Sequence, residues 1–265
     1  MAEFPGKRVE IWRRRSRKEM RNSLGPTRLV WLSALVLLWN PTMYPQSKDA
    51  VANVPGDKLL EQLTGLRDAF VERTQSSGAR CGIRPPTIVL TDIASFGNYD
   101  PKTNRLSTPR WEQLTSQERT LFVSLAGPGA SEGAAQAIFE RGTHHWVFVH
   151  EMGHWWQMCT HANVGRSHYG AEYDANRIAA AYWREVDPKL LAGLVSGFNH
   201  ILAGAPDPVP AGQSVADYFN EHYEKLAHSP AYTWFQAQMI QGVNNEMPAP
   251  SFVKSLDETK SDLRR

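Results

Sequence analysis

Apolar residues recur at helical spacing just after the first 56 residues, at Leu59, Leu60, Leu63, Leu66, Phe70 and Val71. This period predicts an amphipathic helix over residues 57–75. The same kind of pattern predicts further helices over residues 115–125, 134–160, 171–186, 189–202, 215–228 and 231–243. The second of these should be interrupted at Gly142, with Thr143 as the cap of the part that follows. The last dozen residues are rich in charge and are expected to fray.

Two short stretches are rich in residues that favour strands. A pair of prolines introduces the β-branched run 87–91, which predicts a buried strand. Residues 97–101 have the composition of a turn. Residues 104–108 predict a second strand at the edge of the sheet, because Pro109 stops it. With the helices, these strands predict an α+β fold that is rich in helix and has a small sheet.

The net charge of +2 is unevenly distributed along the 265 residues. Residues 1–28 contain nine Lys or Arg and three Glu, which gives +6, so residues 29–265 carry −4. The part of the chain that is expected to fold is therefore mildly acidic and has no basic patch suited to nucleic acid. We expect no nucleic-acid partner.

An apolar run of eleven residues, 29–39, follows the basic stretch. It is short for a membrane span, which needs about 20 residues, but it suits the apolar part of a secretory signal. Residues 1–56 are therefore interpreted as a basic leader, an apolar signal or anchor segment, and a linker. This predicts an exported (periplasmic or extracellular) or membrane-anchored protein rather than a cytoplasmic one. The alternative is a buried helix behind a basic arm.

Cys81 and Cys159 are the two cysteines of the chain. In an exported protein they could form one disulfide. They could equally be two small buried apolar residues, because sequence alone does not show that they meet.

The motif with the clearest chemistry is His150-Glu151-Met152-Gly153-His154. On a helix, residues four apart lie one above the other, so both imidazoles can reach one metal ion. Glu151 lies about 100° further round the helix, where it can take a proton from water on that metal. The residues on both sides of the motif are apolar, which predicts a buried helix. Without a metal, the motif would be two core histidines and a surface carboxylate.

A catalytic zinc site needs a third protein ligand, and the connecting segment and the following helix offer several. Glu172 lies eighteen residues beyond His154, at the start of a predicted helix. Asp174 is its competitor, since the two point about 200° apart on a helix. His161 and His168 are further candidates in the connecting segment.

These residues resemble the gluzincins, a group of zincin metallopeptidases in which a Glu on a following helix is the third ligand. The resemblance implies His150, His154 and Glu172 as ligands of Zn²⁺ and Glu151 as the catalytic base. Many gluzincins have an Asp four residues after that Glu, bonded to a ligand histidine. Asn176 stands at this position, and its amide can accept the same hydrogen bond without the charge. The third-histidine pattern of the metzincins does not fit, because Thr160 stands at its position.

The resemblance implies a zincin-like catalytic domain over residues 57–265. Its N-terminal part, 57–160, would hold the small sheet, with its edge strand beside the motif helix, and its C-terminal part, 161–265, would be helical. The expected activity is hydrolysis of peptide bonds in a peptide or protein substrate. Tyr232, Tyr173, Tyr169 and His168 could each stabilise the oxyanion, although packing in the helix core is the commoner role of such aromatic side chains.

Two rival functions remain open at this point. One is a zinc-binding scaffold without catalytic turnover. The other is a membrane-tethered interaction protein, in which the basic residues near the N-terminus contact anionic lipid. The sequence does not specify the oligomeric state, the substrate, or whether cleavage is internal or terminal.

Overall fold

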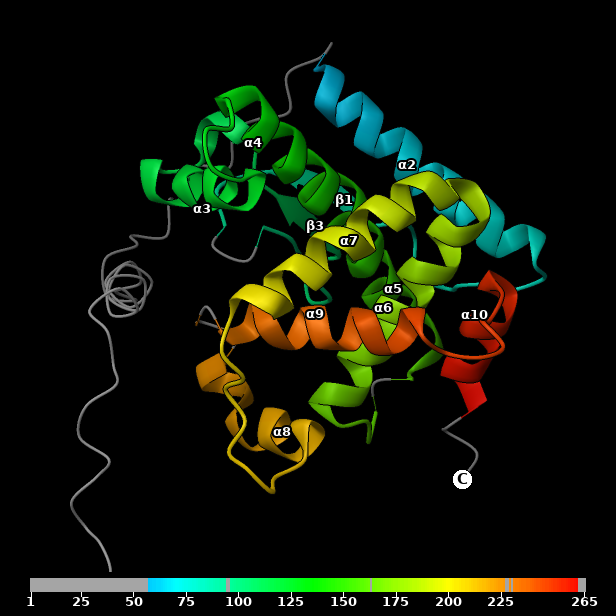
Figure 1. Ribbon diagram of the computed structural model, residues 1–265. Coiled ribbons are helices and arrows are strands. Elements are labelled where there is room, and N and C mark those ends of the chain that lie inside the picture. The colour runs from blue at the N-terminus through cyan, green and yellow to red at the C-terminus, as the bar shows by residue number, and fades with distance from the viewer. Residues whose placement is uncertain (1–56, 94–95, 163, 227–228, 230, 262–265) are drawn as a thin grey trace, which may run out of the picture. The chain divides into compact units, whose positions relative to one another are not determined.

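The computed structural model describes residues 57–261 except 94–95, 163, 227–228 and 230 (Figure 1). All of them lie in the second of two units into which the chain divides, residues 41–265. The leader, apolar run and linker expected in residues 1–56 lie outside the described residues. In the described part, no helix has both the length and the apolar character that crossing a membrane requires.

The described chain is rich in helix and has one small sheet, which confirms the α+β prediction at this level. Its elements, in order, are α2 (Lys58–Ser76), β1 (Thr87–Leu90), β2 (Asn98–Asp100), β3 (Arg105–Thr108), η1 (Trp111–Gln113), α3 (Ser116–Ala126), α4 (Glu132–Glu140), η2 (Arg141–Val147), α5 (Phe148–Thr160), α6 (His168–Val186), α7 (Pro188–Gly204), α8 (Val215–Leu226), α9 (Ala231–Asn244) and α10 (Phe252–Ser261).

The sheet has the strand order β1-β3-β2, with β1 parallel and β2 antiparallel to β3. Leu106 of β3 pairs with Ile88 on one side and Tyr99 on the other, and all three are buried. Two predictions are therefore wrong. The stretch 97–101 contains a strand, and the strand predicted over 104–108 is central rather than at an edge. Three residues are too few to show an alternating pattern, so β2 has no strand signal of its own.

The helix predicted over 134–160 is not interrupted at Gly142. The chain passes from α4 through the π-helix η2 directly into α5. Thr143, the expected cap, is buried inside this run at 2% exposure. A glycine costs a helix only about 1 kcal/mol, which the burial of neighbouring side chains such as Trp146 can offset.

The end of the chain also differs from the prediction, because most of the residues expected to fray belong to α10. Phe252 and Leu256, one turn apart on α10, are fully buried. The start of α6 differs as well. It begins at His168 rather than at residue 171, and the Ser167 side chain accepts a hydrogen bond from the Gly170 N–H at its first turn.

The largest hydrophobic core surrounds α5, which packs against α6, α10, α2 and the sheet (Figure 1). Trp155 and Trp156 of α5 are almost completely buried in this core. A smaller core joins α4 to α3 and η1, and a third lies between α8 and α9. The segment that carries the His-Glu-x-x-His motif is therefore held from several sides.

Cys81 and Cys159 form a disulfide with a Cα–Cα distance of 5.0 Å. The sequence left this pairing open. The bond connects the last turn of α5 to the segment between α2 and β1, 78 residues earlier in the chain. It therefore fixes one end of the motif helix.

Candidate metal centre

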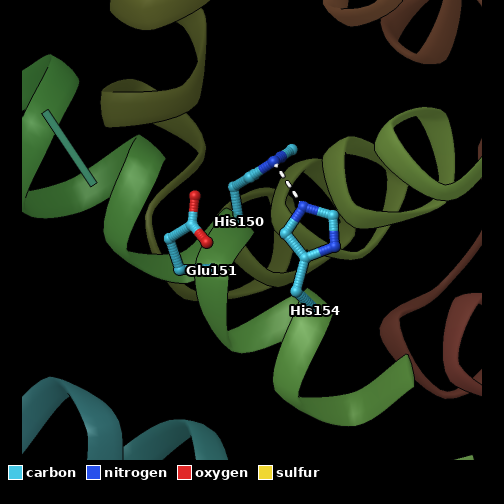
Figure 2. Close-up of side chains that lie close together, drawn as sticks. All are labelled: His150, Glu151 and His154. Atoms are coloured by element: carbon cyan, nitrogen blue, oxygen red, sulfur yellow. Dashed lines mark hydrogen bonds between the residues drawn. The ribbon is translucent and has the colours of Figure 1, made fainter. Parts of the chain in front are cut away.

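Three polar side chains lie within one turn of α5 (Figure 2). His150, Glu151 and His154 place one possible ligand atom each within 4.8 Å of one another. The Nε2 atoms of the two histidines are 3.1 Å apart, and the ring planes stand at 88°. His150 and Glu151 are buried, whereas the His154 side chain is 22% exposed. The group is therefore reached from solvent on the His154 side.

Glu172 of α6 completes the cluster. Its Oε2 atom lies 3.1 Å from His150 Nε2, and its Oε1 atom lies 3.7 Å from His154 Nε2. Two imidazole nitrogens and one carboxylate thus converge on one point. The structure brings together the three ligands that the sequence predicts, and Glu151 lies beside them.

Small residues let α6 approach α5 closely at this point. A Cβ atom added to Gly153 would lie 3.1 Å from the Cα atom and 3.3 Å from the carbonyl oxygen of Ala175. Glu172 and Asn176 flank Ala175 on the side of α6 that faces α5. The contact between Gly153 and Ala175 therefore sets how far these two side chains reach toward the histidines.

The other ligand candidates point elsewhere. Asp174 forms an ion pair with Arg166. His168 stacks on the ring of Tyr223, with centroids 4.0 Å apart. His161 is exposed at the C-terminal cap of α5. Of the acidic side chains near the start of α6, it is Glu172 that contacts the histidine pair.

Each histidine of the pair is held by an amide oxygen at its Nδ1 atom. His150 Nδ1 lies 3.0 Å from Asn176 Oδ1, as the sequence predicts for Asn176. His154 Nδ1 lies 2.8 Å from Gln157 Oε1, and Gln157 in turn donates to the carbonyl of Ala171. An amide oxygen can only accept, so both Nδ1 atoms donate a proton, and each ring directs its Nε2 atom into the cluster.

The cluster holds a proton when no cation is present. Burial alone would lower the pKa of His154, but the negative charge of Glu172 outweighs it and raises this pKa to about 9. Burial would raise the pKa of Glu172, but the histidines hold it well below its usual range. A divalent cation would replace this proton and bind the same three groups.

Glu151 is held by the sheet. Its Oε2 atom accepts a hydrogen bond of 2.8 Å from the backbone N–H of Tyr99 in β2. Gly97, just before β2, allows this approach, because a Cβ atom there would lie 2.2 Å from Val147 Cγ1. The strand beside the motif helix is thus β2, and its N–H at Tyr99 points away from β3.

Aromatic hydroxyls lie near the carboxylates of the site. Tyr223 of α8, which the sequence analysis did not single out, is close enough to Glu172 and Glu151 for their charges to act on its hydroxyl. Burial raises the pKa of Tyr223, and the charges of Glu172 and Glu151 raise it further. Tyr223 lies one turn from buried Phe219 on α8, and this spacing is that of an ordinary core aromatic residue.

The four candidates for stabilising an oxyanion, Tyr232, Tyr173, Tyr169 and His168, lie in different surroundings. Burial, and after it the charge of Glu172, raises the pKa of Tyr232 well above its ordinary value, and its ring packs against Phe219. Tyr173 instead donates its hydroxyl proton to Glu246. Tyr169 packs against Phe219 and Tyr173, and His168 stacks on Tyr223.

The donor set of two imidazoles and one carboxylate suits Zn²⁺, because three protein ligands of this kind leave a fourth position open. No protein-family model matches the chain, and neither a curated protein nor a solved structure matches it. Its function is therefore inferred from the geometry of the described residues.

Proposed function

We propose that the chain is a zinc-dependent metallopeptidase in which His150, His154 and Glu172 bind the metal. The observation that carries this proposal is the convergence of two Nε2 atoms and one carboxylate, at contact distances of 3.1 to 3.7 Å, on two packed helices. Glu151 follows the first ligand directly and lies beside the cluster. A chance pair of core histidines would not require a carboxylate from a second helix at the same point.

Glu151 is the proposed general base. A bound zinc ion would lower the pKa of water to about 7 and polarise the substrate carbonyl. The Tyr99 N–H fixes one oxygen of Glu151, so the orientation of the carboxylate is defined before substrate binds. Glu151 takes the proton of the attacking water and passes it to the leaving amine.

Tyr223 is the proposed donor to the substrate carbonyl oxygen, on which negative charge develops. Its raised pKa keeps the hydroxyl protonated across the neutral range, so it can donate a hydrogen bond. A donor aimed at that oxygen contributes a factor of about 10²–10³ to kcat in well-studied hydrolases.

An extended peptide is the proposed substrate, lying along β2. Tyr99 pairs with Leu106 on one side, and its N–H faces Glu151 on the other. β2 is the last strand of the described sheet on this side, and such a strand can receive a peptide as an additional strand. The scissile bond would then lie next to Glu151 and the metal ligands.

The disulfide supports an exported location, because such bonds persist in oxidising compartments. The apolar run 29–39 after a basic stretch supports export or membrane anchoring. A nucleic-acid partner is not proposed.

The test combines metal content with turnover. Elemental analysis of the full chain should find one zinc per molecule, and a generic protein substrate should be cleaved until a chelator is added. Glu151→Gln should keep the zinc and lose the cleavage. A chain without zinc under metal-replete conditions would contradict the proposal. A zinc-loaded chain that cleaves no peptide would favour the scaffold instead.

A further inference from the structure

The side-chain amides of Asn176 and Gln236 form a hydrogen-bonded network next to the proposed metal ligands. Trp146, at one end of this network, determines which group donates and which accepts at each step. The indole Nε1–H of Trp146 can only donate, and it lies 3.3 Å from Asn176 Oδ1. This contact identifies the oxygen of the Asn176 amide. The same oxygen lies 3.0 Å from His150 Nδ1, which must therefore carry a proton.

Gln236 of α9 continues the network. With its oxygen toward Trp146, Asn176 turns its Nδ2 group to Gln236 Oε1, at 2.7 Å. Gln236 then has its own Nε2 group free to donate to Glu172 Oε2, at 2.9 Å. Glu172 closes the ring through its contact with His150 Nε2. Each amide uses its oxygen as an acceptor and its nitrogen as a donor.

We propose that Gln236 is a positioning residue of the metal centre. It fixes the Asn176 amide in the orientation that keeps the proton of His150 on Nδ1, and it holds the Glu172 carboxylate beside the histidines. One side chain from a third helix thus orients two of the three ligands. This inference rests on the proposed zinc site.

The proposal explains why an asparagine, rather than an aspartate, suits position 176. An aspartate could not donate to Gln236 Oε1. Gln236 would have to turn its amide, which would bring Oε1 against the Glu172 carboxylate. Asn176 and Gln236 are therefore a matched pair, and a change at one should depend on the residue at the other.

The first test is Gln236→Met in the full chain, which keeps the length of the side chain but removes both hydrogen bonds. Zinc affinity, measured by competition with a chromophoric chelator, should fall about 10- to 100-fold. The visible spectrum of the Co²⁺-loaded protein should change, because the ligand geometry changes. Gln241→Met is the matched control. Gln241 lies on the same helix and bonds to Asn199 at an exposed site, so affinity and spectrum should stay unchanged.

The variant Asn176→Asp tests the same proposal if Gln236→Met does not fold. Asn176→Asp should weaken zinc binding in the otherwise unchanged chain, and this loss should shrink or reverse in the Gln236→Met background. Equal affinity and an equal Co²⁺ spectrum for the unchanged chain and Gln236→Met would overturn the role of Gln236 alone. Tighter zinc binding by the single variant Asn176→Asp would also overturn the role of Gln236. Failure of the unchanged chain to bind zinc would overturn the proposed function as well.

Discussion

Gly153 of α5 and Ala175 of α6 meet so closely that a Cβ atom on Gly153 would lie 3.1 Å from the Ala175 Cα. The neighbouring atoms belong mostly to backbone, which cannot move aside as the end of a long side chain can. The separation of the two helices is thus set by this pair, and so is the reach of Glu172 toward the histidines.

Gly153→Ala should push α6 away from α5. We expect a loss of about 1–3 kcal/mol in the free energy of unfolding, as for other overpacked cores, together with weaker zinc binding. Chemical denaturation and chelator competition would measure the two effects. Gly193→Ala on α7 is the control, because an added Cβ there would meet no described atom within 4 Å. That variant should be slightly more stable, and a similar result for Gly153→Ala would refute the close contact.

Gly97→Ala should separate β2 from α5, because the new Cβ would clash with Val147 Cγ1. The hydrogen bond from Tyr99 to Glu151 would then lengthen. We expect kcat to fall while the zinc content stays at one per chain. Val147→Ala in the same protein removes the clashing methyl groups and should restore part of the activity. Full activity in the single variant would argue against a role for β2 in orienting Glu151.

The stability of the metal-free protein should depend on pH through His154. Its pKa is raised to about 9, so the proton contributes stability that is fully present below the ordinary value of about 6.5 and is lost as the pH rises through 9. The lowered pKa of Glu172 affects stability at acidic pH, because the stability that its charged form contributes is lost as the pH falls below the ordinary range of a carboxyl. Thermal unfolding with a chelator present should show a falling Tm from about pH 6.5 to 9.

Glu172→Gln is the control for this pH dependence, because it removes the charge that raises the pKa of His154. The fall in Tm between neutral and alkaline pH should largely disappear. Zinc binding should show the opposite trend and tighten as the pH rises toward 9, since the metal competes with the same proton. A zinc affinity independent of pH over this range would show that no proton is displaced.

Tyr223→Phe should lower kcat by a factor of about 10²–10³ with little change in KM or zinc content, because the hydroxyl is assigned to the transition state. Tyr218→Phe is a matched control on the same helix, where the ring packs against Phe235. If both variants retain full activity, the hydroxyl of Tyr223 has no part in the reaction.

Cys159→Ser should destabilise the protein by about 2–5 kcal/mol, as removal of a native disulfide commonly does. Cys81→Ser should have the same effect, and a reducing agent should reproduce it in the unchanged chain. Denaturation curves with and without the reducing agent would provide the comparison. Superimposable curves would mean that the bond between these residues contributes nothing to stability.

The parts of the site that the sequence predicts are those whose geometry is local. His150, Glu151 and His154 follow from the helical period alone. Glu172 came from a resemblance, and the sequence could not exclude Asp174, because the choice depends on which face of α6 packs against α5. The ion pair of Asp174 with Arg166 is a product of that packing.

The residues that sequence reasoning missed come from elements distant in the chain. Tyr223 and Gln236 reach the site because α8 and α9 pack near α6. The spacing of apolar residues within one helix does not predict which residues of a second helix will lie opposite. The strand β2 is defined by its pairing with β3 rather than by its composition. At the C-terminus the sequence does carry a signal for α10, since Phe252 and Leu256 are spaced as the buried side of a helix.

The π-helix η2 determines how the side chains of α5 are rotated about the helix axis relative to those of α4. One continuous helical run carries Phe139 into the smaller core and Val149 into the larger one. In a regular α-helix each residue adds about 100°, so the wider turns of η2 change the direction in which every later side chain points. Shortening this run by one residue would leave both hydrophobic patterns intact but turn the face of α5 that holds His150 and His154 away from α6. The number of residues between Glu140 and Phe148 therefore determines whether His150 and His154 meet Glu172, just as the identity of these three residues does.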